Sequence, residues 1–563
     1  MSIDIETYRL KAQEAIEYVF VKEYHNSLGI PMPIVKMLLP DDANYSTGQY
    51  YITIDKTWQI HLNFGKLPIS YHEFQNEVKV LTRHEIEHYM CCPFDVITHF
   101  RMLKRIRDVY YKHFSHLGIN IEYACGAISN QAADIIVDTK NYYRHSKETL
   151  KSEIDWIKIG ANISACPRHC KLMFLTKEAI WKEDLGINET DPEFLKIVHQ
   201  LADSFTKNGI EDKSSFLDKV EEYAEIFFKL YVEDQKNPQQ SSQQGSQQQN
   251  GQQGSQQQSG QWGVGRPKDG DEHGNAFVFA DPDKVKEAIE VLVEETSVEE
   301  FIDLLAIAGI IGMSDKQKGV LWFNVQSANI IPIVEFSNTG NKSSYTYPSV
   351  WRIGDPIEEL DLMLTYMTSP RLIPGMTTKK WGYVSNDDNG TESKQMDLLL
   401  VVDTSGSMGS AMKESANMHQ AVLASYGILS YFESTKSKVA FIGFSDKIDA
   451  YVDWSDKYDD VRERLLTNGH GGTKFPISRI KSTLDVRSRD LVTVLITDGD
   501  LGNINESVSY FRDYLNDDNK LYIFLLGGSK SLHSYEPLKN IGAKIYNANN
   551  ANEFCDMVLT DME

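Results

Sequence analysis

The sequence predicts a multidomain protein with two folded parts of different class. Residues 396–563 alternate between short apolar runs and helical periodicity, a pattern typical of an α/β doubly wound parallel sheet. Residues 1–233 are mainly helical with one strand pair, which predicts a mainly α domain of the α+β class. Between these parts, residues 235–260 consist mostly of Gln, Ser and Gly. These three observations predict the fold class.

Composition disfavours several classes of protein. The chain has 563 residues and a formal net charge of −23, which argues against a nucleic-acid partner because phosphate backbones attract Lys and Arg. The first twenty residues are polar and do not resemble a signal peptide. The longest apolar stretch, residues 301–313, contains Asp303 and is too short for a membrane span. Six cysteines in so long a chain do not form a disulfide framework, so we expect a reducing, cytoplasmic location.

The N-terminal part contains a polar helix that carries the first motif. The predicted elements before it are a helix over residues 5–24 and strands over residues 50–54 and 58–63. Residues 71–90 read YHEFQNEVKVLTRHEIEHYM, with helical periodicity and neither Pro nor Gly. Later helical patterns cover residues 123–143, 191–206 and 214–231.

The motif is H-E-x-x-H, formed by His84, Glu85 and His88. Residues four apart lie on one helical face, so the two imidazoles can bind one Zn²⁺. Glu85 can then reach a water at the open position and take its proton. The alternative is a solvated helix face that is rich in His and Glu. Glu87 places a charge where such helices usually have an uncharged residue, which makes the helix wetter or gives Glu87 a partner beside the site.

A catalytic zinc needs a third protein ligand, and the helix over residues 123–143 offers candidates. Asn130, Asp134 and Asp138 are spaced four apart and share one face. We expect Asp134 to be the third zinc ligand, and Asp138 and Asn130 to support the ligands or, alternatively, to replace Asp134. The opposing interpretation is an acidic face in solvent.

The middle of the chain predicts a flexible connection and a partly helical region. Residues 234–275 include the Gln-rich stretch, which cannot bury enough apolar surface to offset chain entropy and should be a disordered linker. We expect residues 276–392 to pack on the last domain, with helices over residues 281–295, 297–312 and 354–367. Cys166 and Cys170 lack the spacing of a zinc ribbon, and we expect buried free thiols there.

Hydroxyl and carboxylate side chains collect at strand ends in the C-terminal part. Residues 396–409 read MDLLLVVDTSGSMG, a buried strand that ends in Asp403 and is followed by Ser405 and Ser407. Thr473 lies in the loop NGHGGT, and Asp498 follows another apolar strand. Open α/β sheets bind ligands at the carboxyl ends of their strands, and Mg²⁺ prefers such oxygens. The alternative is that Asp403 and the serines cap the next helix.

The remaining elements of this part alternate as a doubly wound sheet requires. We expect helices over residues 410–431, 458–466, 474–484, 505–515, 532–541 and 551–559. We expect strands over residues 438–444, 491–497, 521–526 and 544–547.

The two motifs together resemble a known family. HEIEH followed by NQAAD resembles the zincin-like domain of predicted metal-dependent peptidases that carry a C-terminal von Willebrand factor A-like domain. DTSGS, GGT and TDG resemble the metal-ion-dependent adhesion site of that second domain. The resemblance implies domains at residues 1–233 and 393–563. It also implies roles for two sets of residues: a zinc site with its base (His84, His88, Asp134, Glu85) and a magnesium site (Asp403, Ser405, Ser407, Thr473, Asp498).

The resemblance also implies a function and a partner. Proteins of this layout are typically associated with a MoxR-type AAA+ ATPase. We therefore expect a zinc-dependent peptidase whose magnesium site docks a protein partner through a carboxylate. The alternative is a catalytically inactive adaptor that delivers clients to the ATPase.

Overall fold

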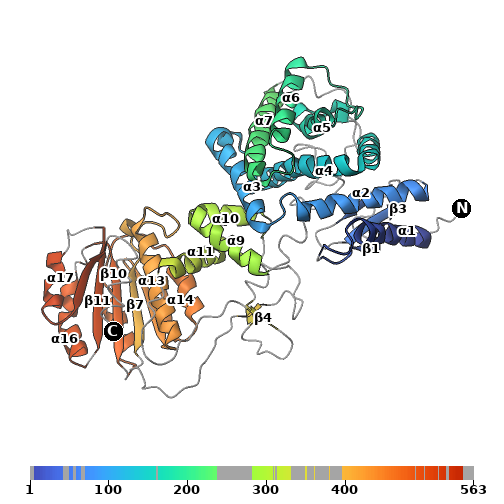
Figure 1. The fold of residues 1–563 in the computed structure, drawn as a ribbon. Coiled ribbons are helices and arrows are strands. Elements are labelled where there is room, and N and C mark those ends of the chain that lie inside the picture. The colour runs from blue at the N-terminus through green and yellow to red at the C-terminus, as the bar shows by residue number, and fades with distance from the viewer. Residues whose placement is uncertain are drawn as a thin grey trace. The chain divides into compact units, whose positions relative to one another are not determined.

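The computed structural model is of mixed α/β class (Figure 1). It describes residues 5–28, 30–41, 50–54, 59–64, 70–159, 163–236, 282–308, 310, 313–330, 349–351, 360–361, 379–380, 396–487, 490–499, 501, 503–517, 519–527 and 532–548. The chain divides into two compact units. The first unit comprises Met1–Ala288 with Ala306–Ile310, and the second comprises Ile289–Leu305 with Ile311–Glu563. The domain boundaries expected from the sequence stay a prediction.

A small sheet and two helices begin the first unit. The sheet has the order β1-β3-β2, in which β1 is parallel and β2 antiparallel to β3. Buried side chains of β3, such as Ile60 and Leu62, share one core with Phe74 and Val78 of α2. Strand β1 was not expected from the sequence. The elements are α1 (Ile5–Glu17), the π-helical turn η1 (Tyr18–Glu23), β1 (Ile34–Met37), β2 (Tyr50–Ile54), β3 (Gln59–Phe64) and α2 (Tyr71–Met90).

The prediction for the motif helix is confirmed at both ends, and its start has a clear cause. Ser70 caps α2 by accepting a hydrogen bond from the backbone N–H of Glu73, and its hydroxyl donates to the Glu73 carboxylate. Helix α2 packs between α1 and α4 (Ile121–Ile159). Helix α4 extends past the end of the helix expected over residues 123–143, because a second helical segment continues after a kink at His145 (φ −135°, ψ 48°), beyond the candidate ligands.

The other helices of the first unit pack on α4 or on the neighbours of α4. Helices α3 and α5 were not expected from the sequence, and α7 extends past its expected end because Asp234 accepts hydrogen bonds from Arg168 and His169. The first three residues of the predicted linker, 234–236, therefore belong to α7, and residues 237–281 lie outside the described part. The elements are α3 (Val96–Val109), η2 (Tyr110–Phe114), η3 (Ser115–Leu117), η4 (Ile163–Ala165), α5 (Arg168–Trp181), α6 (Pro192–Thr206), η5 (Lys213–Ser215) and α7 (Phe216–Lys236).

Helices precede the large sheet of the second unit. Helix α9 (Pro282–Glu295) crosses the boundary between the units, and α10 (Val298–Ile307) and α11 (Asp315–Ile330) follow it. Ser297 with Glu300, and Ser314 with Gln317, form reciprocal capping boxes that start α10 and α11. Helix α11 packs on α13 (Asn417–Ser434).

A short antiparallel sheet corrects one prediction. Its order is β4-β6-β5, formed by Ser349–Val350, Lys379–Lys380 and Leu360–Asp361. The helix expected over residues 354–367 is wrong at Leu360–Asp361, because their backbone pairs with β6. The rest of that expected helix lies outside the described residues.

The main sheet has the order β12-β11-β10-β7-β8-β9. All its neighbouring strands are parallel except β9, an antiparallel edge strand that was not expected. Every residue of β7 and β10 is buried because helices cover both faces of the sheet (Figure 1). The strands are β7 (Asp397–Asp403), β8 (Val439–Phe444), β9 (Ile448–Ser455), β10 (Leu491–Thr497), β11 (Lys520–Leu526) and β12 (Lys544–Ala548).

The helices of this sheet follow the expected order with three corrected starts, one of which is the helix expected from residue 505, which begins at Val508 after a 3₁₀ turn. Helix α13 begins at Asn417, not at residue 410, because residues 410–416 form turns and Ala416 is extended. Helix α15 begins at Ile477, directly after Pro476. The helix expected over residues 551–559 lies outside the described residues. The other elements are η8 (Gly406–Met408), α14 (Tyr458–Leu465), α15 (Ile477–Leu484), η9 (Ile504–Ser507), α16 (Val508–Asn516) and α17 (Leu532–Lys539).

None of the helices in the described residues combines the length and the apolar character that crossing a bilayer demands.

Candidate functional site

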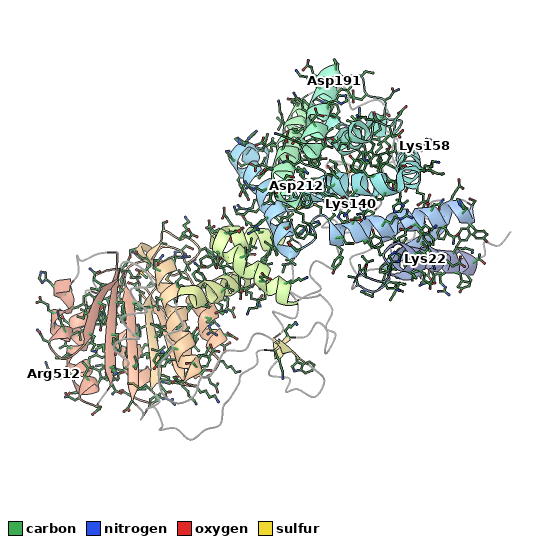
Figure 2. All side chains as sticks on the ribbon, viewed as in Figure 1. Lys22, Lys140, Lys158, Asp191, Asp212 and Arg512 are labelled. Atoms are coloured by element: carbon green, nitrogen blue, oxygen red, sulfur yellow. The ribbon has the colours of Figure 1, made fainter. Side chains whose placement is uncertain are left out.

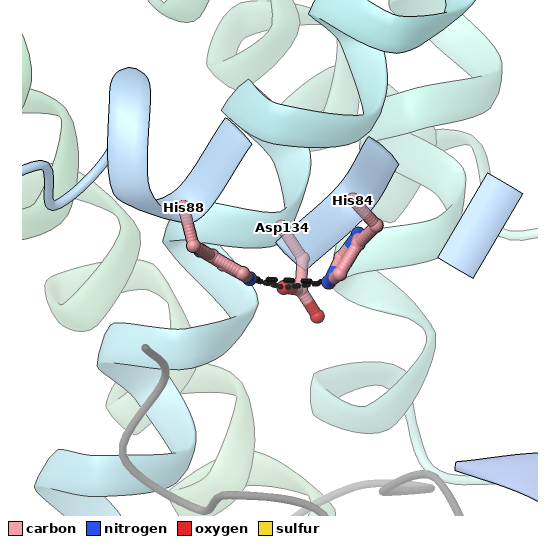
Figure 3. Close-up of side chains that lie close together, drawn as sticks. All are labelled: His84, His88 and Asp134. Carbon is pink, nitrogen blue, oxygen red and sulfur yellow. Dashed lines mark hydrogen bonds and ion pairs between the residues drawn. The ribbon is translucent and has the colours of Figure 1, made fainter. Parts of the chain in front are cut away.

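Three side chains from two helices of the first unit meet at one point (Figure 3). His84 and His88 come from α2, and Asp134 comes from α4. The Nε2 atoms of the two histidines are 3.1 Å apart. Asp134 Oδ1 lies 3.4 Å from His84 Nε2 and 3.2 Å from His88 Nε2. The structure therefore brings together the three residues that the sequence predicted as zinc ligands.

The far side of each imidazole is held by a hydrogen-bond acceptor. His84 Nδ1 lies 2.6 Å from Asp138 Oδ1, and His88 Nδ1 lies 2.8 Å from the carbonyl oxygen of Cys92. A carbonyl and a carboxylate accept hydrogen bonds, so we assign the proton of each neutral ring to Nδ1. Each Nε2 then directs a lone pair toward Asp134, which is the tautomer that binds a metal.

The donor set fits a zinc ion. Asp134 Oδ1 is buried and accepts no hydrogen bond from any described residue, although it faces two ring nitrogens. Three electron-rich atoms repel one another unless a cation lies between them. A tetrahedral zinc with ligands at about 2.0–2.1 Å places neighbouring ligand atoms about 3.3 Å apart. The three observed separations, 3.1, 3.2 and 3.4 Å, bracket that value.

Burial excludes both alternatives in which these residues lie on solvated helix faces, one on α2 and one on α4. His84 and His88 are only 3% and 2% exposed, and Asp138 is 5% exposed. Asn130 donates from Nδ2 to Asp134 Oδ2 at 3.2 Å, so Asn130 and Asp138 contact the three converging residues without joining them.

Glu85 and Glu87 lie in opposite environments. Glu85 is half-buried, and its carboxylate makes no hydrogen bond or ion pair with a described residue. Glu87 is fully buried and is bonded to Lys140 at 2.8 Å, Arg144 at 3.0 Å and the Tyr24 hydroxyl at 3.0 Å. The idea that Glu87 makes the helix wetter is therefore wrong: it ties α2 to α4. Glu85 keeps a carboxylate available for proton transfer.

The cysteines do not form a second cluster among the described residues. Cys166 and Cys170 are free thiols, half-buried and buried respectively, and burial raises the pKa of both. The prediction of free thiols is confirmed for these two residues.

A second group of predicted site residues lies at the carboxyl ends of β7 and β10. Ser405 Oγ is 3.1 Å from Ser407 Oγ, and the Ser407 hydroxyl donates to Asp498 Oδ1 at 3.0 Å. Asp403 is fully buried below them and accepts hydrogen bonds from the Ser405 N–H at 2.9 Å and the Thr497 hydroxyl at 2.7 Å. Hydrogen bonds therefore join four of the five predicted residues.

Thr473, the fifth, makes no hydrogen bond to these four residues. Its loop is nevertheless attached to theirs, because the Gly406 N–H donates to the Gly471 carbonyl at 3.3 Å. Space here is tight: a Cβ at Gly469 would lie 2.5 Å from the Thr404 carbonyl oxygen. Only glycine lets the two loops approach this closely.

The oxygens of this second group fit Mg²⁺. Octahedral magnesium with ligands at about 2.0–2.1 Å places adjacent oxygens about 2.9 Å apart, close to the separations of 3.1 and 3.0 Å that Ser407 makes. Burial, with the nearby charge of Asp498, raises the pKa of Asp403 even though Ser405 and Thr497 donate to it. The capping interpretation is wrong for the next long helix, since α13 begins only at Asn417.

Sequence reasoning missed two residues that support these groups. Lys177 on α5 donates to Asp138 Oδ2 at 2.5 Å, and Asn417 donates to Asp498 Oδ2 at 3.0 Å. Both contacts join residues far apart in the chain, so no spacing rule could find them.

Comparison of the chain with models of known protein families, and with curated proteins, finds no match.

Proposed function

We propose that the protein is a zinc-dependent peptidase with a magnesium-dependent docking site for a protein partner. One observation supports the zinc-dependent peptidase most directly. The buried Oδ1 of Asp134 accepts no hydrogen bond from a described residue and faces two imidazole nitrogens at zinc-ligand spacing. In this proposal residues 1–233 form a zincin-like domain and residues 393–563 a von Willebrand factor A-like domain. The protein works in the cytoplasm.

Each residue of the first site has a defined task. His84, His88 and Asp134 hold the zinc, which supplies the Lewis acidity that polarises the scissile carbonyl and makes a nearby water more acidic. Glu85 follows His84 directly in α2 and has no competing partner among the described residues, so it accepts the proton of the attacking water. The same carboxyl then donates that proton to the leaving amine as the peptide C–N bond breaks.

The exchange of Glu85 for Gln tests the peptidase half. Glu85→Gln should retain zinc, measured by elemental analysis, and lose about 10²–10⁴-fold in the rate of hydrolysis of a denatured-protein substrate library, since an amide cannot take the proton. Glu77→Gln, on the same helix, is the matched control and should remain active. Hydrolysis that is equal in Glu85→Gln and wild type contradicts the peptidase half and leaves the adaptor as the function.

The docking half rests on the oxygen cluster of the second unit. Ser405, Ser407 and Asp498 present oxygens at the sheet edge, where Ser407 is exposed and Asp498 half-buried. A carboxylate of the partner would complete the ligand set that these side chains begin. By its resemblance to the family, the chain would bind a MoxR-type AAA+ ATPase through this site.

A pull-down with the ATPase tests the docking half. EDTA and Asp403→Ala should each weaken binding, and added Mg²⁺ should restore binding of the EDTA-treated wild type but not of the variant. Asp517→Ala, at the C-terminal end of α16, is the control and should bind as the wild type does. Equal retention of wild type and Asp403→Ala contradicts a role for the site in docking.

A further inference from the structure

A lysine is buried behind the zinc candidate in the first unit. Lys177, on α5, is 2% exposed, and its ammonium contacts two carboxylates. It donates to Asp138 Oδ2 at 2.5 Å and to Glu153 Oε1 at 3.0 Å. The other oxygen of Asp138 accepts from His84 Nδ1 at 2.6 Å. A continuous chain of contacts therefore runs from His84 through Asp138 and Lys177 to Glu153.

Burial of these charged groups opposes folding. Removing an ammonium and a carboxylate from water is strongly unfavourable unless each group has well-placed partners. Burial alone lowers the pKa of Lys177, but the charges of Asp138 and Glu153 outweigh it and raise the pKa above its ordinary value. The lysine is therefore held as a cation, and both oxygens of Asp138 are occupied by donors on opposite sides.

The two imidazoles differ in how they are anchored. His88 is held by the Cys92 backbone carbonyl, whose position depends on the turn after α2. His84 is held by the carboxylate of Asp138, which could rotate if its second oxygen had no hydrogen-bond donor. Lys177 donates to that second oxygen. The orientation of His84 consequently depends on Lys177, a residue of a third helix that is distant in the sequence.

We propose that Lys177 is a positioning residue for the zinc site: through Asp138 it fixes the ring of His84 with Nε2 toward the metal. The inference rests on the zinc site proposed above. Glu153 completes the arrangement by accepting a hydrogen bond from Lys177 on its other side. Loss of such outer partners typically weakens metal binding about 10–100-fold.

Zinc affinity, measured by competition with a chelator, tests this role on the full-length protein. Lys177→Met should bind zinc about 10–100-fold more weakly than wild type. The matched control is Lys140→Met, which removes another buried lysine, on α4 (Lys140 is labelled in Figure 2). Lys140 pairs with Glu87 and Glu211, and the side-chain partners of Glu87 are Lys140, Arg144 and Tyr24, not the ligands. Loss of Lys140 should therefore lower the free energy of unfolding yet leave zinc affinity unchanged.

A double variant separates positioning from general damage to the fold. Lys177→Met with Asp138→Asn removes both buried charges, and the amide oxygen of the asparagine can still accept from His84 Nδ1. We expect this pair to recover at least part of the lost affinity, because the orphaned carboxylate is gone. The visible spectrum of the Co²⁺-substituted protein should change for Lys177→Met and return toward the wild-type spectrum in the double variant.

The outcomes are distinct. Wild-type zinc affinity in folded Lys177→Met overturns the inference while the zinc site stands. Equal losses in Lys177→Met and Lys140→Met, without recovery in the double variant, also overturn it, because that result reflects the fold alone. Failure of the wild type to bind zinc overturns the proposed function and with it the inference.

Discussion

The two candidate metal sites are built on opposite plans. The first is assembled from helices α2 and α4, and its three converging side chains are 14% exposed or less. The second lies on loops after strands β7 and β10 and is partly open, with Ser407 exposed. The first combines two nitrogens with one oxygen, and the second offers oxygens alone. Nitrogen ligands suit zinc, and hard oxygens suit magnesium.

The two sites also differ in the partners of their buried carboxylates. In the first unit every buried carboxylate near the site has a cationic or histidine partner: Asp138 has Lys177, and Glu87 has Lys140 and Arg144. In the second unit Asp403 is held by neutral donors, and burial raises its pKa. A preorganised, buried site is suited to chemistry on a substrate. An open site with neutral donors is suited to a partner that brings its own charge.

Loss of Asp134 should have the largest effect, and it tests whether the buried site of the first unit binds zinc. Asp134→Ala removes one of three ligands, so zinc binding should fall by more than the roughly 100-fold typical of outer partners. Elemental analysis of the purified protein should then find the zinc missing. Asp155→Ala, on the same helix but paired with Lys151 at the surface, should keep it. Full zinc content in Asp134→Ala would move the third ligand elsewhere.

Loss of Asn417 should have an intermediate effect on the second site. The Asn417 amide donates to Asp498 Oδ2, and a hydrogen bond to a charged group contributes about 1.5–3 kcal/mol. We expect Asn417→Ala to weaken Mg²⁺ binding, measured by isothermal titration calorimetry, on the order of 10-fold, without changing zinc content. Asn516→Ala, at the exposed end of α16, provides the control. Unchanged Mg²⁺ affinity would show that Asp498 does not need this donor.

The smallest effect concerns the pH dependence of the second unit. His419 is 3% exposed, donates to the Ala411 carbonyl, and contacts the rings of Trp322 and Phe323 from α11. Burial lowers its pKa, opposed by the Ala411 carbonyl and Glu414. Below pH about 6.5 the unfolded chain takes up the proton first, so the free energy of unfolding falls as pH decreases toward the folded-state pKa.

The exchange of His419 for Gln should remove this contribution. A glutamine can still donate to the Ala411 carbonyl but does not titrate. Thermal unfolding of wild type should therefore lose a few °C relative to His419→Gln between pH about 7 and pH about 5.5, at about 2–4 °C per kcal/mol. A difference between the two proteins that stays constant across this range contradicts the prediction.

Local patterns in the sequence were enough for the elements that carry the motifs. Helix α2 was predicted over its full length, because its 3.6-residue periodicity and its lack of Pro and Gly are local signals. The parallel strands β7 and β10 were predicted from their continuous apolar runs. The spacing of His84, His88 and Asp134 placed each on the proper face of its helix, since helical geometry is set by neighbours in the chain.

Tertiary structure alone decided which partners these residues have. Glu87 looked like a solvent-facing charge but is buried, because Lys140 and Arg144 arrive from a helix more than fifty residues later. Lys177 and Asn417 likewise reach their carboxylates across the fold. The edge strands β1 and β9 were missed for local reasons: β1 (IVKM) is only four residues long and has no buried position, and two aspartates interrupt the apolar residues of β9 (IDAYVDWS). Sequence periodicity reports the face of a helix or strand, whereas the charges that meet across that face depend on long-range packing.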